Sequence, residues 1–470
     1  MRAYLLLPLA CLVFAGGASA APSGPARLNV LHIISDDLNA DLSSYGAVKV
    51  RTPNLDRLAA RAMQFNGAYC NYPVCNASRT SFLSGRRPDT TRIVDNFTPT
   101  RTHLEDAVFL PEYFRRQGYR TLKVGKIYHE EPEWEDPRSW DVDIRQPVWA
   151  KRASPDQVIR RQGPSGIVIR TPDEDTWDGQ VARRAVEFLE DSSRSGTPFF
   201  VAAGFRSPHL PYIAPEKYYA LYDPAGFAPR AGPPEHLADI PAMALTYLIK
   251  ERSFPRFPTE RPGDTIAAYY AAISYMDAQV GVILDALDRL QLWDRTVVIF
   301  HSDHGYHLGE HGGLWAKMSL FEESARVPLL VAAPGRPAGS TRGLVELVDL
   351  YPTLADLCNL PAPGELEGTS FRPLLEQPNR AWKQAVFTVV NRRFPPGEYD
   401  PAAVGRSVFD GRWRYTEWPD GSTELYDHDS DPYEYANLAR QPARQQQVEH
   451  MRSVLHAGWQ AALPARREYK

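Results

Sequence analysis

Short apolar runs alternate with segments of helical periodicity along most of the chain. Uninterrupted apolar runs are typical of strands that are buried on both faces of a parallel sheet. They predict strands at residues 29–34, 121–124, 198–203, 296–300 and 327–333, and the periodic segments predict helices at 53–62, 110–118, 175–193 and 266–290. This order predicts an α/β protein with a large mixed, mostly parallel sheet flanked by helices.

The pattern changes to β near residue 385. Segments 407–409 and 412–415 flank Asp410-Gly411, a strong signal for a two-residue hairpin. A helix is predicted around 448–455. We therefore expect two units: a main α/β domain over 25–375 and, over 376–470, a small C-terminal antiparallel sheet with one helix.

Two stretches rich in proline and charge, at 130–172 and 224–262, show little periodicity. Long connections of this kind often form lids or substrate walls. We expect both to run over the surface of the main domain.

The N-terminus has the features of a secretory signal peptide. Arg2 precedes an apolar run over 4–15, and Ala18-Ser19-Ala20 matches a small-residue cleavage site. The run is too short to span a membrane. The sequence therefore predicts a signal peptide over 1–20, cleavage after Ala20, and a secreted or periplasmic protein without a membrane span.

Composition narrows the class of protein. The 470 residues are 43% hydrophobic, enough to bury a sizeable core, and the formal net charge of −4 argues against nucleic-acid binding. Beyond the signal peptide there are three cysteines, an odd number for an oxidising compartment: Cys70, Cys75 and Cys358. Spacing alone does not decide whether Cys70 and Cys358 form a disulfide, and Cys75 is the candidate for special chemistry.

Acidic residues follow two of the predicted strands. Asp36-Asp37 come after strand 29–34, and Asp303-His304 come after strand 296–300. Open α/β sheets bind ligands at the carboxyl ends of their strands, and carboxylates suit a hard divalent cation. Acids that merely cap a loop are the alternative interpretation.

Cys75 lies in a short turn that leads into an apolar helix, which Gly85 can end, and Arg79 lies one helical turn beyond Cys75 on the same face. Three further polar groups occupy strand ends or glycine-rich loops: the Lys126-x-x-His129 pair, His209 between two prolines, and Lys317. A buried structural cysteine and ordinary surface groups are the alternatives for these residues.

The segment Cys75-Asn76-Ala77-Ser78-Arg79 resembles the sulfatase signature Cys-x-Pro/Ala-x-Arg, with Ala77 where proline is commonest. Its continuation over 81–92 and the Lys126-x-x-His129 spacing are similar to the iduronate-2-sulfatase branch, and 424–432 resembles the C-terminal strand and turn of the family. The resemblance implies an alkaline-phosphatase-like fold and hydrolysis of sulfate esters, on a sulfated sugar or a glycosaminoglycan-type saccharide.

The same resemblance implies a site. Cys75 would be oxidised to formylglycine by a formylglycine-generating or anaerobic sulfatase-maturating enzyme, and the hydrated aldehyde would attack sulfur. Ca²⁺ is the usual metal, with Mg²⁺ next. The metal shell implied is Asp36, Asp37, Cys75, Asp303 and His304. Among the catalytic residues, Arg79 and Lys126 would hold the diol, His129 would be the base, and His209 and Lys317 would bind sulfate and assist the leaving group.

Two other functions stay open at this point. The chain can instead be a phosphate or phosphonate ester hydrolase of the same superfamily, or a non-catalytic sulfated-carbohydrate-binding protein in which Cys75 remains a thiol. The sequence names neither the sugar, nor the position of its sulfate, nor exo- or endo-action, nor the oligomeric state. The basic pairs Arg86-Arg87, Arg160-Arg161 and Arg392-Arg393 can line sugar subsites or be solvated.

Overall fold

The computed structural model describes residues 27–129, 134–144, 157–248, 252–253, 261–392 and 399–464. The predicted signal peptide, the pair member Arg393 and parts of the two proline-rich stretches lie outside the described residues. Within the described part, no helix is long and apolar enough to cross a membrane.

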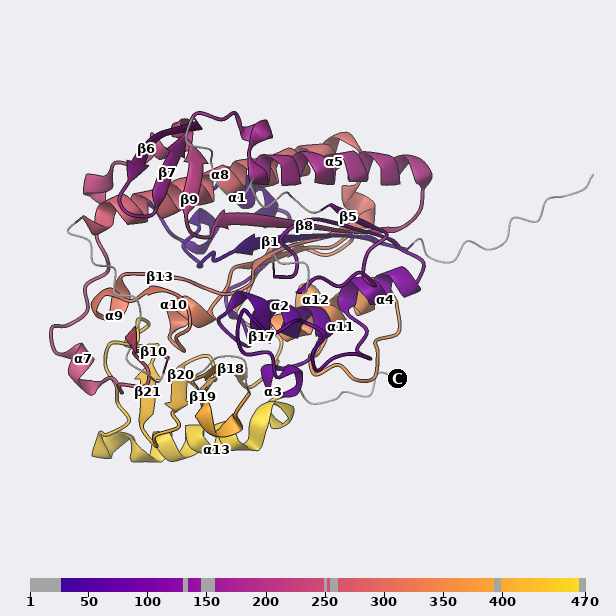
Figure 1. Cartoon of the computed structure of the whole chain (residues 1–470). Coiled ribbons are helices and arrows are strands. Elements are labelled where there is room, and N and C mark those ends of the chain that lie inside the picture. Colours follow the sequence, from indigo (N-terminus) through magenta and orange to yellow (C-terminus); the bar gives the residue numbers. More distant parts are fainter. Residues whose placement is uncertain are drawn as a thin grey trace, which may run out of the picture.

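An eight-stranded sheet forms the centre of the molecule (Figure 1). In spatial order the strands are β16 (Gly339–Thr341), β2 (Met63–Phe65), β15 (Leu329–Ala332), β12 (Thr296–Ser302), β1 (Asn29–Asp36), β8 (Phe199–Pro208), β4 (Arg120–Gly125) and β5 (Val142–Ile144). The five strands from β12 to β5 run parallel to one another, whereas β15 pairs antiparallel with β12 and with β2. The predicted large, mixed and mostly parallel α/β sheet is confirmed.

Side chains of β1 alternate between two hydrophobic cores. Leu31 and Ile33 pack into the first core, and Val30 and Ile34 into the second. The first core lies under α1 (Pro53–Ala59), α5 (Trp177–Ser195) and α8 (Pro262–Arg289), and the second under α2 (Cys75–Ser84), α4 (Leu110–Arg116), α11 (Leu350–Leu357) and α12 (Arg372–Glu376). Figure 1 shows these helices as layers on opposite faces of the sheet.

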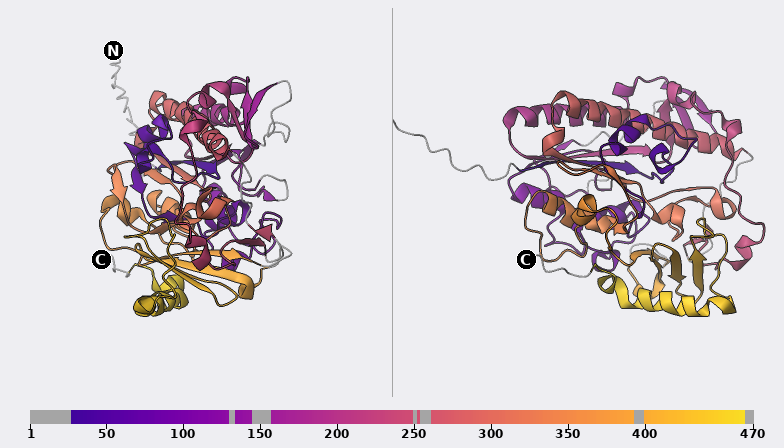
Figure 2. Two further views of the ribbon diagram at one scale, coloured as in Figure 1. Left: turned by 90° about the vertical axis from the view of Figure 1, so that its left-hand side faces the viewer. Right: turned by 180° about the vertical axis from the view of Figure 1, so that it is seen from behind.

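A four-stranded antiparallel meander follows near the C-terminus, as expected. Its strands are β18 (Val386–Asn391), β19 (Val404–Phe409), β20 (Trp413–Glu417) and β21 (Thr423–Asp427), and α13 (Gln445–Ala461) packs along it (Figure 2). The β19–β20 turn is centred one residue later than predicted, because the Asp410 N–H bonds the Trp413 carbonyl at 3.1 Å and Gly411 takes the positive φ of 99°.

The first proline-rich stretch contains structure that the sequence did not predict. β6 (Val158–Gln162), β7 (Gly166–Ile169) and the distant β9 (Tyr212–Pro215) form a three-stranded sheet. β6 is only partly buried and carries two exposed arginines, so it has no apolar alternation to detect. Its pairing depends on β7 and β9, which supply the buried face.

The remaining elements are short. They are η1 (Ser43–Tyr45), β3 (Ala68–Tyr69), α3 (Pro88–Thr91), η5 (Asp173–Asp175), α6 (Glu216–Tyr219), η6 (Pro224–Gly226), α7 (His236–Asp239), β10 (Thr246–Leu248), β11 (Arg252–Ser253), η7 (Trp293–Arg295), β13 (His307–Leu308), α9 (Glu310–Gly313), β14 (Trp315–Ala316), α10 (Glu322–Ala325), β17 (Val345–Glu346), η8 (Leu347–Asp349), η9 (Pro401–Ala403) and η10 (Pro442–Arg444). Cys70, Cys75 and Cys358 are all buried and free, so the structure contains no Cys70–Cys358 disulfide among these described residues.

Candidate active site

The acidic pairs meet at one edge of the central sheet because β1 and β12 are parallel neighbours. Asp36 ends β1, Asp37 follows it, and Asp303-His304 follow β12. Asp37 has a positive φ of 64°, and its backbone N–H donates to the Asp303 carboxylate at 3.2 Å. This close approach brings the two strand ends together as the sequence predicted.

Four potential ligand atoms converge at this edge. One atom each of Asp36, Asp37, Cys75 and His304 lies within 4.8 Å of all the others, and all four residues are buried. His304 Nδ1 is 2.9 Å from the Gly305 carbonyl, which orients Nε2 toward the acids. Asp303 borders the group, with its Oδ2 atom 3.6 Å from His304 Nε2. The donor set fits a divalent cation.

The signature segment forms α2, and its N-terminus places Cys75 against this edge. Ser78 Oγ donates to the Asp303 carbonyl at 2.5 Å, which fixes the first turn of the helix to the end of β12. Gly85 ends α2 in the left-handed conformation with φ of 67°, where a Cβ atom would meet Leu366. The predicted end of this helix at Gly85 is confirmed, but the helix begins at Cys75 itself and not after a turn that contains it.

Arg79 bridges the two acidic strand ends. Its side chain is fully buried, with Nη2 3.0 Å from Asp36 Oδ1 and Nε 2.9 Å from Asp303 Oδ2. Nη1 donates to the carbonyls of Lys126 and Ile127 at 2.7 and 3.1 Å. The guanidinium therefore joins three separate chain segments.

Two lysines complete the charged cluster. Lys126 Nζ is 2.5 Å from Asp36 Oδ2, at the end of β4, where Gly125 and Gly204 leave room for close approach of β4 and β8. Lys317 Nζ bonds Asp37 and is 3.2 Å from Cys75 Sγ. Lys317 follows the β13–β14 hairpin, so a local turn brings it to the site.

The two histidines have different described contacts. His209 Nε2 is 3.9 Å from Asp37 Oδ2, and His209 Nδ1 is held 2.6 Å from the Leu210 carbonyl. The ring of His129 packs edge-on against Trp134, with 5.1 Å between centroids. His129 thus follows Lys126 in the same segment, but its described ring contact is with Trp134.

Cations stabilise the ionised acids in this buried environment. Burial raises the pKa of the Asp36 carboxyl, but Lys126, His209 and Arg79 outweigh burial and hold the pKa well below its usual range. The pKa of the Cys75 thiol is raised, chiefly by burial and to a smaller extent by the negative charge of Asp36, so an unmodified Cys75 stays neutral. The environment therefore does not activate Cys75 as a thiolate.

One supporting residue was not predicted from the sequence. Asp178, in the first turn of α5, is buried and accepts the backbone N–H groups of Arg206 and Ser207 at 2.8 and 2.9 Å. These contacts hold the segment that carries His209. An acid at a helix start is the sequence signal, but it is indistinguishable there from an ordinary helix-dipole partner.

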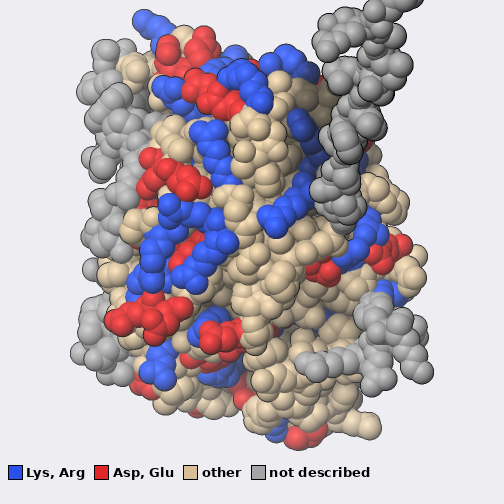
Figure 3. All heavy atoms as spheres, turned by 90° about the vertical axis from the view of Figure 1, so that its right-hand side faces the viewer, with Lys and Arg blue, Asp and Glu red and all other residues tan. Residues whose placement is uncertain are grey.

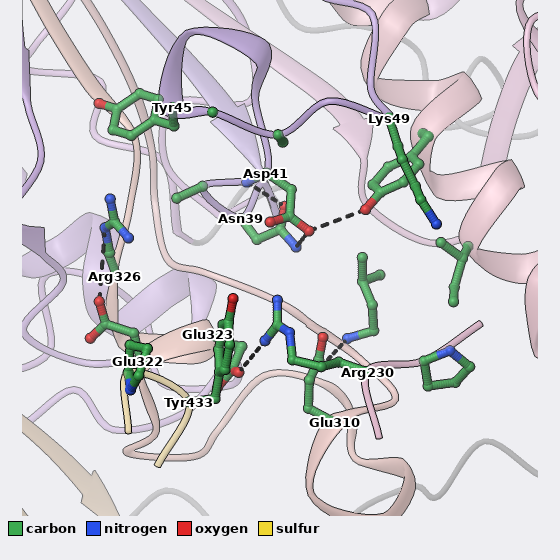
Figure 4. Close-up of a pocket in the computed structure, with 18 of the residues that line it drawn as sticks. Asn39, Asp41, Tyr45, Lys49, Arg230, Glu310, Glu322, Glu323, Arg326 and Tyr433 are labelled. Carbon is green, nitrogen blue, oxygen red and sulfur yellow. Dashed lines mark hydrogen bonds and ion pairs between the residues drawn. The ribbon is translucent and has the colours of Figure 1, made fainter. Parts of the chain in front are cut away.

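A separate cavity of about 790 Å³ opens elsewhere in the molecule (Figure 4). Its charged lining has both signs, and Arg230 pairs with Glu323 at 3.0 Å. The charged side chains include Asp41, Lys49, Arg230, Glu310, Glu323 and Arg326. Lys, Arg, Asp and Glu are also interspersed on the face shown in Figure 3. The cavity lining therefore does not concentrate charge of one sign.

Comparisons with known proteins agree with this geometry. The sulfatase family model matches residues 28–360, and a model described as N-sulphoglucosamine sulphohydrolase, C-terminal, matches residues 309–460. Iduronate 2-sulfatase from Homo sapiens is 34% identical over 419 residues, which cover 78% of this chain and 75% of the relative. Choline-sulfatase from Rhizobium meliloti (strain 1021) is 30% identical over 440 residues, covering 88% and 83%.

Among solved structures, the phosphonate monoester hydrolase of Agrobacterium radiobacter superposes with a TM-score of 0.79 at 25% identity. The match covers 92% of this chain and 95% of that chain. The family model extends over most of the described main sheet and includes every residue of the cluster built around Cys75. The chain belongs to the sulfatase family and is a sulfuric ester hydrolase.

Proposed function

We propose that the enzyme removes sulfate from a saccharide, using a formylglycine derived from Cys75 and one divalent cation. The observation that carries the proposal is the position of Cys75: it lies at the N-terminus of α2 with its Sγ 3.4 Å from His304 Nε2 and 3.2 Å from Lys317 Nζ. A neutral buried thiol has no evident use there, whereas a modified side chain would face both the acids and the cations.

The proposed cation ligands are Asp36, Asp37, Asp303, His304 and the modified residue 75. Oxygen-rich shells favour Ca²⁺, and Mg²⁺ is the second candidate. A bound divalent cation would supply Lewis-acid polarisation of the nucleophilic hydroxyl. Adding it to a cluster of three carboxylates and three basic side chains would leave an excess of positive charge, which suits an incoming sulfate.

The remaining residues would divide the work around the ester. Arg79 and Lys126 would orient the hydrated aldehyde, since both already hold Asp36 beside it. Lys317 and His209 would contact the sulfate oxygens and the leaving oxygen, because both lie against Asp37. We assign His129 as the base that collapses the sulfated intermediate, on its spacing from Lys126.

Support for a saccharide substrate comes from the relatives. Iduronate 2-sulfatase is the named activity of the 34%-identical human relative. Choline-sulfatase, at 30% identity, shows by its name that relatives at similar distance act on a small non-sugar ester. The charged surroundings of Cys75 fit a polar ester of either kind, so the substrate assay must include both.

The proposal is tested by assaying purified enzyme on sulfated mono- and disaccharides beside choline sulfate. We expect saccharide sulfates to give the highest kcat/KM. Mass spectrometry of the Cys75 peptide from the native host should find formylglycine, and elemental analysis should find one divalent cation, Ca²⁺ before Mg²⁺. Active enzyme that contains only the free thiol would refute the formylglycine assignment.

A second candidate is hydrolysis of phosphate or phosphonate esters. The phosphonate monoester hydrolase whose fold matches over 92% of this chain is the specific reason to test it. We expect sulfate esters to exceed matched phosphate and phosphonate esters in kcat/KM when they are assayed side by side. The reverse order would transfer the proposed role of the site to the second candidate.

A further inference from the structure

Phe97 is an exposed aromatic residue that the proposed catalysis does not use. Its relative exposure is 68%, and it is the only exposed phenylalanine among the residues that the structure describes. Aromatic side chains contribute much of the contact area at binding surfaces, so an exposed ring whose backbone is fixed is a candidate contact residue.

The backbone around Phe97 is fixed by side chains. Asp95 is buried, and its Oδ1 atom accepts the N–H groups of Phe97 and Thr98, both at 2.7 Å. Its Oδ2 atom accepts Thr98 Oγ1 at 3.0 Å. These bonds form a compact turn that presents Phe97 outward.

The turn is attached to the start of the signature helix. The amide of Asn76, the residue after Cys75, donates to the carbonyls of Asp95 and Thr98 at 3.0 and 2.8 Å. In return, the Asn96 side chain accepts the Asn76 backbone N–H at 3.0 Å. Phe97 is therefore carried by a turn that is bonded to the neighbour of Cys75.

The other end of the same loop reaches the segment of His129. Thr100 Oγ1 donates to the Trp134 carbonyl at 2.8 Å, and the Trp134 ring packs edge-on against His129. The loop over 94–100 thus lies between two segments that carry proposed catalytic residues. Phe97 is therefore exposed on a loop that is bonded to the residue after Cys75 and to the neighbour of His129.

We propose that Phe97 is a specificity-determining platform on which a sugar ring of the substrate stacks. The inference rests on the proposed saccharide sulfatase function and adds the residue that recognises the carbohydrate. The face of a pyranose that carries C–H groups is apolar and matches an aromatic ring in size. Residues around Cys75 are polar or charged and bind the sulfate, whereas Phe97 supplies apolar contact to the ring that bears it or to the next ring.

The test compares Phe97→Ala, Phe97→Trp and a matched control, Tyr433→Ala. Tyr433 is 44% exposed and lines the separate cavity of Figure 4. Because stacking binds substrate and transition state alike, Phe97→Ala should raise KM for a sulfated disaccharide about tenfold with kcat nearly unchanged. Phe97→Trp should restore KM, and Tyr433→Ala should leave it at the wild-type value.

Inorganic sulfate provides a readout that a distorted site would change and a lost platform would not. Its inhibition constant should be the same in wild type and Phe97→Ala, because the free anion occupies the charged cluster without reaching residue 97. Equal KM values for wild type and Phe97→Ala overturn the inference. A parallel rise in the sulfate inhibition constant also overturns it, since the substitution would then act through the catalytic cluster.

These outcomes differ from failure of the proposed function. If the wild type hydrolyses choline sulfate or phosphate esters but no sulfated saccharide, the substrate class is wrong and the platform is rejected with it. If sulfated saccharides are good substrates and Phe97→Ala leaves their KM unchanged, only the platform is rejected.

Discussion

Arg79 shows how one residue can hold an active site together. It is fully buried and contacts Asp36, Asp303 and two backbone carbonyls of the Lys126 segment. A guanidinium offers donors in a fixed planar array, whereas an ammonium group is a single point of charge. A lysine at this position would keep the positive charge but could not make the same set of hydrogen bonds.

We predict that Arg79→Lys destabilises the protein and almost abolishes activity. Loss of a partner from a buried ion pair costs about 3–5 kcal/mol, and loss of a charged contact in the site costs about 10²–10³ in rate. Urea unfolding and kcat/KM would measure the two effects. The control is Arg115→Lys, whose guanidinium is 42% exposed beside Asp141; a change of under about 0.5 kcal/mol is expected. Equal effects of the two substitutions would contradict the argument.

At the same scale, the sequence predicted the acids and Arg79 but not their pairings. The i, i+4 spacing of Cys75 and Arg79 and the position of the acids after strands are local patterns, which a sequence displays. Contact of Lys317 with Asp37 depends on how the β13–β14 hairpin folds back, and this is set by tertiary packing. The contact between His129 and Trp134 has no local signal either.

Among the elements, β8 and α5 act together to present His209. β8 is longer than predicted and ends at Pro208. Its last residues are held by hydrogen bonds to Asp178 of α5. Ser35 of β1 adds a hydrogen bond to the Ser207 carbonyl at 2.9 Å. The His209 segment is thus held from a helix and from the neighbouring strand.

We predict that Asp178→Asn lowers activity by displacing this segment. The amide has one acceptor oxygen and directs N–H groups at a second N–H, so one of the two backbone bonds is lost at a cost of about 1–3 kcal/mol. A small displacement of His209 should reduce kcat/KM on sugar sulfates by about 10- to 100-fold. An aryl sulfate, whose leaving group needs little protonation, should lose much less.

The matched control for this helix is Asp191→Asn, an exposed acid in α5 that pairs with Arg194. It should leave activity and thermal unfolding unchanged. If Asp178→Asn reduces sugar and aryl sulfate hydrolysis equally, the residue supports the fold and does not position His209.

Elements with strong local patterns were predictable, and those that depend on partners were not. The apolar stripe over 266–290 predicts a helix, and this helix is α8. The pattern is readable in the sequence because the stripe faces the first core. The strand over 327–333 was predicted but not its antiparallel direction, because direction is decided by the connection and not by the strand's own residues. β7 pairs with β6, the strand just before it, but also with β9, which lies far along the chain, and this distant pairing has no local signal.

Across the whole molecule, a buried ionic network joins the signature region to the C-terminal meander. Glu346 accepts both Arg87 Nη atoms at 2.6 and 2.5 Å and Lys383 Nζ at 2.7 Å. Lys383 also bonds Asp349 at 2.7 Å, and the Arg87 guanidinium lies 4.8 Å from the Trp459 ring of α13. The division into units at 375 and 376 remains a prediction, and this network indicates that the two parts unfold together.

The network predicts a specific loss of stability in acid. Burial raises the pKa of the Glu346 carboxyl, but Arg87 and Lys383 outweigh it and lower the pKa to about 2. A carboxyl whose pKa is lowered by folding stabilises the folded state at a pH above its pKa in the unfolded chain, which is about 4.3. This contribution is lost as the pH falls toward about 2. Burial raises the pKa of Asp349, which acts in the opposite direction and offsets part of the loss.

We predict that Glu346→Gln destabilises the protein at neutral pH by about 3–5 kcal/mol, because two buried cations lose their shared partner. Between about pH 4.3 and 2, the variant should lose less stability than the wild type, since its amide does not titrate. Urea unfolding over this pH range, followed by tryptophan fluorescence and far-UV circular dichroism, measures both effects.

Glu365→Gln is the control, because Glu365 is 76% exposed beside Arg86 and its substitution should change stability little. If the wild type and Glu346→Gln show the same pH dependence, the pKa of Glu346 is not lowered in the folded state; if the two probes give separate transitions, the parts do not unfold together.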